Sequence, residues 1–222
     1  MKNNTKSQIL ELKSLGLHRY ASWALYDTPQ AQVDNDETIR ASQNKWPEYD
    51  IDELSDLVNT DAMLLGLNAA DRGVLDENGK PNEWLNFHDY RGRTHDAGIT
   101  RMTKGNWFEG AYMTDIFKDL NLTNSGAVRS AVKAQPGIYN RSMELLDQEL
   151  EIIKPQIIVI FGKPARESWQ AAVNNGDITK PMDAKVFFVD HYSNQTSNEN
   201  KRLRLQTPEI IDAIAKIKAN NK

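Results

Sequence analysis

The segment QIIVIFG at 156–162 constrains the fold more than any other stretch of this sequence. Its five consecutive apolar residues, mostly β-branched, predict a strand that is covered on both faces. Amphipathic helices are predicted immediately before it, over 139–153, and after it, over 163–173. A buried strand between two helices is typical of a parallel sheet with helices on both faces.

Three more strands are predicted at 62–67, 110–117 and 184–191, and the closing helix begins near Thr207. Asp50, with Glu53 three residues later, predicts a capped helix just ahead of the first strand. We therefore expect an α/β fold, a three-layer α/β/α arrangement around a central, mostly parallel four-stranded sheet. Residues 1–60 are expected to form a helical segment packed on the core, and residues 61–222 the α/β/α domain.

Composition excludes several classes of chemistry. The 222 residues contain no cysteine, which excludes disulfides, thiol nucleophiles and cysteine-ligated metals. The N-terminus lacks a signal-peptide pattern, and no apolar run approaches the roughly 20 residues of a membrane span, so we expect a cytoplasmic protein with no membrane partner. The net charge of −4 does not by itself favour nucleic-acid binding. Basic residues gather at 91–104 and 201–204, where solvated loops are the simpler interpretation.

Small or polar residues follow each predicted strand. In parallel sheets, ligands bind outside the carboxyl ends of the strands, where these residues are expected to meet. They are Gly66 and Asn68 after the first strand, Asp115 near the end of the second, Gly162 and Lys163 after the third, and His191, Tyr192 and Ser193 after the fourth. The sequence therefore predicts a binding or catalytic site at this edge.

Four segments, LLGLNAADR, AYMTDIFKDL, KPQIIVIFGKPA and DHYS, resemble the motifs of the uracil-DNA glycosylase superfamily in order and approximate spacing. The resemblance covers roughly residues 60 to 195. It implies hydrolysis of the N-glycosidic bond of a uracil-type or other modified base, without a cofactor or metal. The implied partner is DNA or a nucleoside or nucleotide.

The resemblance also implies roles for individual residues. Asn68 matches the position that holds the attacking water, and His191 matches the histidine that hydrogen-bonds the leaving base. Phe87 is placed where an aromatic ring would stack on the base. Each has a structural alternative, which is turn geometry for Asn68, a satisfied strand-end histidine for His191 and core packing for Phe87. The expected substrate-binding residues are Gly66, Phe87, Asp115, Gly162, Lys163 and Ser193.

Asp115 departs from the family pattern, because it aligns with an asparagine that reads uracil. An ionised carboxylate only accepts hydrogen bonds, so it suits a base edge rich in N–H donors unless it is protonated. It could instead cap a neighbouring loop. Ala69 and Ala70 replace the usual Pro-Gly, and HYSNQTSNEN offers no apolar wedge. The substrate could therefore be single-stranded or a free nucleotide, or the protein could be an inactive relative.

Other functions compete with this interpretation. The pairs His88-Asp89 and His95-Asp96 could bind a divalent metal for hydrolysis, although the intervening glycines favour a loop. A binding module without turnover could hold a phosphate at the helix start after Gly162, assisted by Lys163. The aromatic segment HRYASWALYD could contact a partner, although core packing explains it equally well.

Overall fold

A five-stranded sheet forms the centre of the protein in the computed structural model, which describes residues 2–43, 49–68, 83–88, 96–120, 122, 125–179, 183–194 and 196–220. The strand order is β1-β3-β2-β4-β5. The parallel strands are β2 (Asn59–Asn68), β3 (Ala111–Phe117), β4 (Ile157–Phe161) and β5 (Lys185–Val189). The prediction of four strands is one short, because β1 (Ser22–Trp23) pairs antiparallel with β3.

Side chains of β2 and β4 alternate between the two faces of the sheet. In β2, Met63 and Leu65 join one buried cluster, whereas Leu64 joins the other. In β4, Ile158 and Ile160 join the first cluster and Val159 the second. Every residue of β4 is at most 1% exposed, which confirms a strand covered on both faces.

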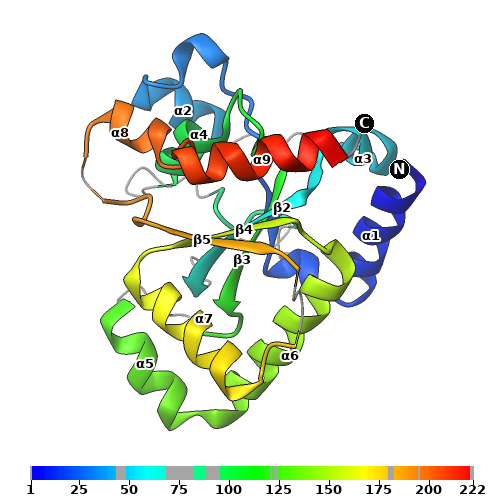
Figure 1. The fold of residues 1–222 in the computed structure, drawn as a ribbon, viewed down its shortest axis with the longest axis vertical. Coiled ribbons are helices and arrows are strands. Elements are labelled where there is room, and N and C mark those ends of the chain that lie inside the picture. The colour runs from blue at the N-terminus through cyan, green and yellow to red at the C-terminus, as the bar shows by residue number, and fades with distance from the viewer. Residues whose placement is uncertain are drawn as a thin grey trace.

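Helices lie on both faces, as a three-layer arrangement requires (Figure 1). The first cluster takes side chains from α1 (Lys2–Ser14), α5 (Ser125–Ala134), α6 (Pro136–Ile153) and α7 (Lys163–Asn175). The second takes them from α4 (Ala97–Thr103) and α9 (Pro208–Asn220). The remaining helices are η1 (Leu17–Arg19), η2 (Gln30–Gln32), α2 (Asp36–Gln43), α3 (Ile51–Leu57) and α8 (Asn198–Leu203).

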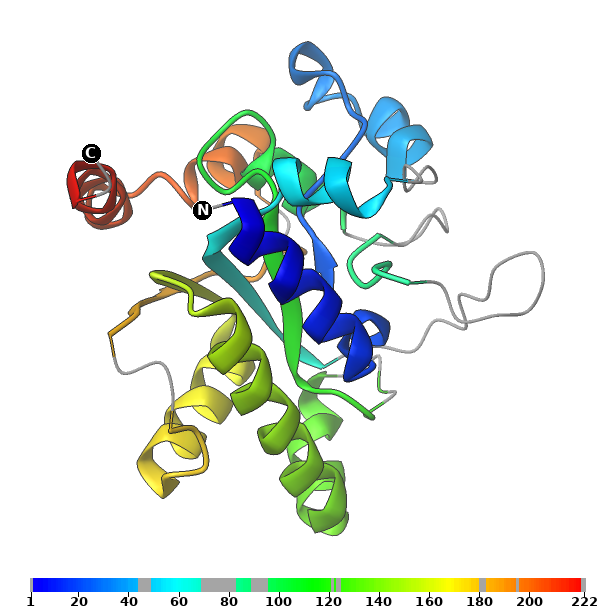
Figure 2. The same cartoon turned by 90° about the vertical axis from the view of Figure 1, so that its right-hand side faces the viewer.

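The N-terminal segment is integrated with the sheet and its helices. Helix α1 lies beside α3 and α6 (Figure 2), and Ile9 and Leu12 are buried in the first cluster. The side chain of Gln8 donates to the carbonyl of Ile152 at 2.7 Å, at the end of α6. The capping box of α3 is confirmed, with Asp50 accepting from Glu53 N and Glu53 reaching back to Asp50 N.

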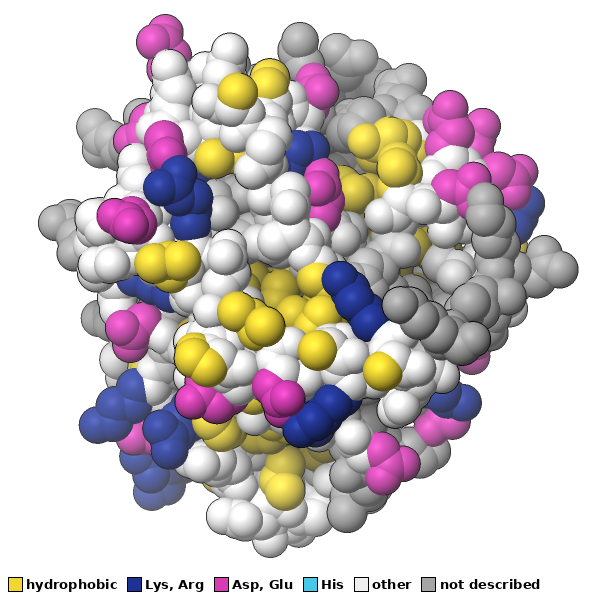
Figure 3. All heavy atoms as spheres, turned by 45° about the horizontal axis from the view of Figure 1, so that its top comes forward, with side chains coloured by type: hydrophobic (Ala, Val, Ile, Leu, Met, Phe, Trp, Pro, Cys, Tyr) yellow, Lys and Arg dark blue, Asp and Glu magenta, His cyan; other side chains and the backbone are white. Residues whose placement is uncertain are grey.

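The surface around α9 carries charges of both signs. Figure 3 shows hydrophobic side chains gathered in a hollow near the centre of the view, with acidic and basic side chains distributed around it.

Within the described ranges, no helix has both the length and the apolar character needed to cross a bilayer. Ala69 and Ala70, which replace the usual Pro-Gly, and Asp89 and His95 lie outside the described residues.

Candidate active site at the carboxyl ends of the strands

A cavity of about 490 Å³ opens where the parallel strands end. All the predicted site residues except Phe87 line it, namely Gly66, Asn68, Asp115, Gly162, Lys163, His191 and Ser193. Leu67, Leu122, Phe161, Pro164, Ala165, Asp190, Tyr192 and Asn194 complete the lining. Four strands that are distant in sequence therefore bring their terminal polar groups to one cavity.

Asn68 ends β2 and anchors the segment after β3. Its Nδ2 donates to the carbonyls of Leu120 at 3.0 Å and Leu122 at 2.7 Å. Only an amide nitrogen can satisfy two carbonyl acceptors, so this contact fixes the orientation of the side chain. Oδ1 is then the atom that can accept a hydrogen bond from a water molecule. The side chain has a structural role and also keeps an acceptor for the role that the resemblance implies.

Ser193 sets the tautomer of His191. The backbone N–H of Ser193 donates to His191 Nδ1 at 3.2 Å, and Ser193 Oγ lies 2.7 Å from the same nitrogen. A nitrogen that accepts a backbone N–H carries no proton, so in the neutral ring the proton is on Nε2. The imidazole is thus arranged as a hydrogen-bond donor through Nε2. Ser193 acts on the site by orienting His191.

Gly162 allows His191 to approach the end of β4. It has φ of 81°, and a Cβ added there would lie 3.2 Å from the Cβ of His191. Any larger residue would combine an unfavourable backbone conformation with a tight contact against the imidazole. Lys163 follows at the mouth of the cavity, where its side chain is 84% exposed and lies 3.8 Å from Glu167.

Phe87 lies behind the cavity wall. It is buried, its φ is 64°, and its Cζ would be 3.1 Å from a Cβ added to Gly66. Its ring meets Tyr192 edge-on, with centroids 6.2 Å apart, and Tyr192 stacks on His191 at 4.2 Å. Phe87 thus supports the aromatic wall from within the core. Left-handed backbone at an aromatic residue costs about 1–3 kcal/mol, which the surrounding packing must offset.

Asp115 forms the buried floor of the cavity beside Gly66. A Cβ at Gly66 would lie 2.1 Å from Asp115 Oδ1, so only glycine leaves room for the carboxyl group. Asp115 Oδ2 accepts from Asn86 Nδ2 at 2.8 Å. Burial raises the pKa of Asp115 to about 7, against the lowering effects of the Asn86 hydrogen bond and of Lys118. The carboxyl group of Asp115 is thus hydrogen-bonded to the side-chain amide of Asn86.

A buried ion pair lies beneath this floor. Lys118 and Glu149 are both fully buried, and Lys118 Nζ donates to Glu149 Oε2 at 2.5 Å and to the backbone carbonyl of Asp115 at 2.6 Å. Glu149 Oε1 also accepts from the hydroxyls of Tyr112 and Thr114, each at 2.9 Å. Because the charges are paired and hydrogen-bonded, this network fixes the end of β3 and hence the position of Asp115.

Of the two pairs considered for a metal, only His88 and Asp96 lie among the described residues, where no group of three or more metal-binding side chains occurs. His88 is buried, its Nε2 lies 3.0 Å from the carbonyl of Trp23, and its ring stacks on Tyr26 at 4.6 Å. Burial lowers the pKa of His88 to about 4, so the ring is neutral at physiological pH. His88 is therefore a core residue with a hydrogen-bonded imidazole.

The basic segments are partly committed to structure. Arg101 is buried and pairs with Asp36. Arg204 Nη1 donates to the carbonyl of His191 at 2.6 Å, and Arg202 pairs with Asp34. The interpretation of solvated loops is therefore wrong for Arg101, because an ion pair with Asp36 compensates its burial.

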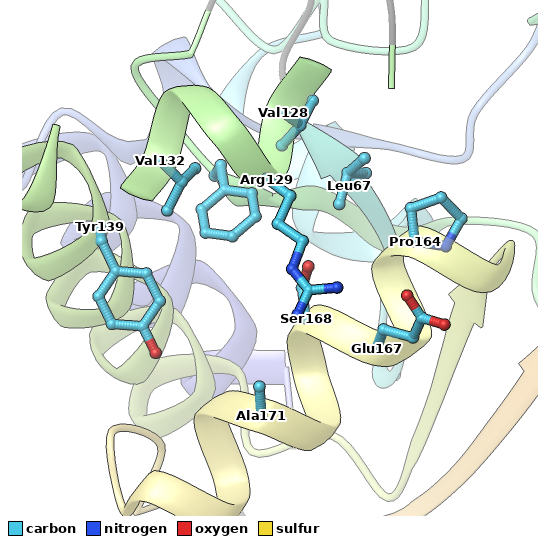
Figure 4. A pocket seen from close by; sticks show the side chains of 10 residues that line it. Leu67, Val128, Arg129, Val132, Tyr139, Pro164, Glu167, Ser168 and Ala171 are labelled. Carbon is cyan, nitrogen blue, oxygen red and sulfur yellow. The ribbon is translucent and has the colours of Figure 1, made fainter. Parts of the chain in front are cut away.

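A second cavity, of about 340 Å³, lies between α5, α6 and α7. Figure 4 shows the side chain of Arg129 extending across it toward Ser168, with Glu167 close by. Leu67 and Pro164 border both cavities, so the two are neighbours. This second cavity was not predicted from the sequence, because helix α5 was not predicted.

Asn86 was not predicted as a site residue, and Tyr192 was predicted at the strand ends without a specific role. Asn86 bonds to the Asp115 carboxyl group, and Tyr192 carries the stacking between His191 and Phe87. The one available signal for Asn86 was its place beside Phe87 in WLNFHD, a stretch with no regular pattern.

No protein-family model matches this chain, and no curated protein shows significant similarity to it.

Proposed function

We propose that this protein hydrolyses the N-glycosidic bond between a modified base and its deoxyribose, in DNA or in a nucleotide. The observation that carries the proposal is the meeting of Asn68, Asp115 and His191 in one cavity at the carboxyl ends of the parallel strands. Such edges are where α/β sheets bind ligands. The resemblance of the four sequence segments to uracil-DNA glycosylases supports the same reaction.

The reaction breaks the C1′–N bond and leaves its electron pair on the base, so positive charge develops on the sugar and negative charge on the base. His191, with its proton on Nε2, donates a hydrogen bond to the departing base and stabilises this charge. Asn68 Oδ1 accepts a hydrogen bond from the water whose oxygen bonds to C1′. The hydroxyl group from this water remains on C1′ of the sugar. The remaining proton of the water neutralises the negative charge of the released base. An asparagine orients this water without deprotonating it.

The experiment that tests this proposal measures free base released from oligonucleotides that contain uracil, hypoxanthine, xanthine or a thymine mispair. Release without added metal, leaving an alkali-labile abasic site, is expected. His191→Ala should lower the rate roughly 100- to 1,000-fold. Ser193→Ala should have a smaller effect, because the backbone N–H still reaches Nδ1. Lys216→Ala, on the surface of α9, is the control.

A second candidate is a nucleotide-binding module without turnover. Helix α7 begins after Gly162 without a side-chain cap, so its first N–H groups are available to an anion, and Lys163 lies beside them. This candidate predicts saturable nucleotide binding, no release of base from any substrate, and loss of binding in Lys163→Glu. Release of base that depends on His191 would exclude it.

A further inference from the structure

Asn86 uses every polar atom of its side chain. Its Nδ2 donates to the carbonyl of Tyr20 at 2.7 Å and to Asp115 Oδ2 at 2.8 Å. Its Oδ1 accepts from the N–H of Phe87 at 3.1 Å. Because both hydrogens and the oxygen are committed, the amide cannot rotate without losing three contacts. Asn86 therefore holds the Asp115 carboxyl group in one orientation.

The two oxygens of Asp115 consequently differ. Oδ2 faces the N–H of Asn86, whereas Oδ1 lies against Gly66, which lines the cavity together with Asp115. In a protonated carboxyl group, the carbonyl oxygen accepts hydrogen bonds better than the hydroxyl oxygen does. The N–H of Asn86 therefore favours the form in which Oδ2 is the carbonyl oxygen and Oδ1 carries the proton.

We infer that Asn86 fixes the proton of Asp115 on Oδ1, so that the cavity presents a hydroxyl donor to a carbonyl oxygen of the bound base. This inference rests on the proposed function and specifies its substrate class. The protonated site accepts oxo-bases, such as uracil or hypoxanthine. The amino-bases, such as cytosine, present an N–H group at the corresponding position and would meet this hydroxyl donor to donor.

The surroundings of Asp115 allow this protonated form at physiological pH. Burial is the largest influence and raises its pKa to about 7, so the protonated and ionised forms are both populated near neutrality. The charged groups that act on it are Lys118, which lowers the pKa, and Glu149 of α6 and Asp96 before α4, which raise it. His191 lines the same cavity from the end of β5.

Two substitutions separate the contributions of the two residues. In Asp115→Asn, the amide oxygen should take the place of Oδ2, facing Asn86, and the NH₂ group should take the place of Oδ1. This variant is a permanent donor that no longer titrates. In Asn86→Asp, the new carboxyl group and Asp115 Oδ2 should share one proton at the place of the former hydrogen bond. Asp115 Oδ1 then carries no proton and is an acceptor.

The experiment measures the binding of free uracil and free cytosine to the full-length protein from pH 5 to 9 by nuclear magnetic resonance titration. The wild type should prefer uracil by about tenfold at pH 6, with the preference declining above pH 7. Asp115→Asn should keep the preference at every pH, and Asn86→Asp should reverse it. Thermal denaturation of each variant establishes that it is folded.

A second readout does not depend on base binding or turnover. The carboxyl carbon of Asp115, followed by ¹³C resonance, should titrate near pH 7 in the wild type and higher in Asn86→Ala. Titration below pH 5 in the wild type, or equal affinity for the two bases at pH 6, would overturn the inference. Retained discrimination in a protein that releases no base would refute the proposed reaction and still support this role of Asn86.

Discussion

Replacing Gly66 by alanine should destabilise the protein and also abolish base binding. The added methyl group would lie 2.1 Å from Asp115 Oδ1 and 3.1 Å from Phe87 Cζ, whereas ordinary contacts begin at 3.4 Å. The carboxyl group must therefore move by more than 1 Å, although Asn86 holds its other oxygen at 2.8 Å. Overpacking of this kind costs about 1–3 kcal/mol. For a chain of this size, each kcal/mol lowers the melting temperature by roughly 2–4 °C.

Gly137→Ala is a matched control with the opposite expected sign. Gly137 lies in the first turn of α6, with no atom within 4 Å of an added Cβ. Alanine at a compatible helical position stabilises by about 0.4–1 kcal/mol, because it restricts the unfolded chain. Both variants are measured by thermal and urea denaturation, and Gly66→Ala also by uracil binding. A Gly66→Ala protein as stable as the wild type, with unchanged binding, would refute the packing described at the cavity floor.

Three further predictions concern the buried ionisable groups. Lys118→Met should cost about 3–5 kcal/mol in urea denaturation, because it leaves Glu149 buried without its cation, and Lys118→Met with Glu149→Leu should recover much of the loss. Because burial lowers the pKa of His88 to about 4, its contribution should reduce the free energy of unfolding by about 3 kcal/mol in total as pH falls from 6.5 toward 4. Because burial raises the pKa of Asp115 to about 7, its contribution should reduce the free energy of unfolding by about 4 kcal/mol as pH rises from 3.8 toward 7. The pH dependences of stability that come from His88 and Asp115 have opposite signs. In Asp115→Asn, the free energy of unfolding should therefore rise clearly between pH 4 and 6.5. A pH–stability profile that is the same as in the wild type would contradict the raised pKa of Asp115.

The parallel part of the fold was predictable because its signals are local. The apolar run of β4 and the capping box of α3 each depend on a few adjacent residues, and both were confirmed. Strand β1 was not predictable, since two residues carry no period and its pairing with β3 is a long-range contact. Helix α5 was not predicted either, although Val128 on one of its faces is buried in the first cluster.

The candidate site was predictable as a set of strand ends but not in its internal contacts. The convergence of Asn68, Asp115 and His191 follows from parallel topology alone. The bond between Asn86 and Asp115 joins a loop to a strand 29 residues later, and no pattern in the sequence encodes it. Base stacking and core packing were both considered for Phe87, and its buried ring, which does not line the cavity, fits core packing.

The proposed cleavage of a base from its sugar in this cavity is tested most directly by product analysis with stoichiometric amounts of the protein. An oligodeoxynucleotide with a single uracil or hypoxanthine is incubated with the protein, and both products are weighed by mass spectrometry. We predict free base and an intact strand with one abasic site for the wild type, and almost none for His191→Ala. Substrate recovered with every base in place, or equal release by the His191→Ala protein, would contradict the account.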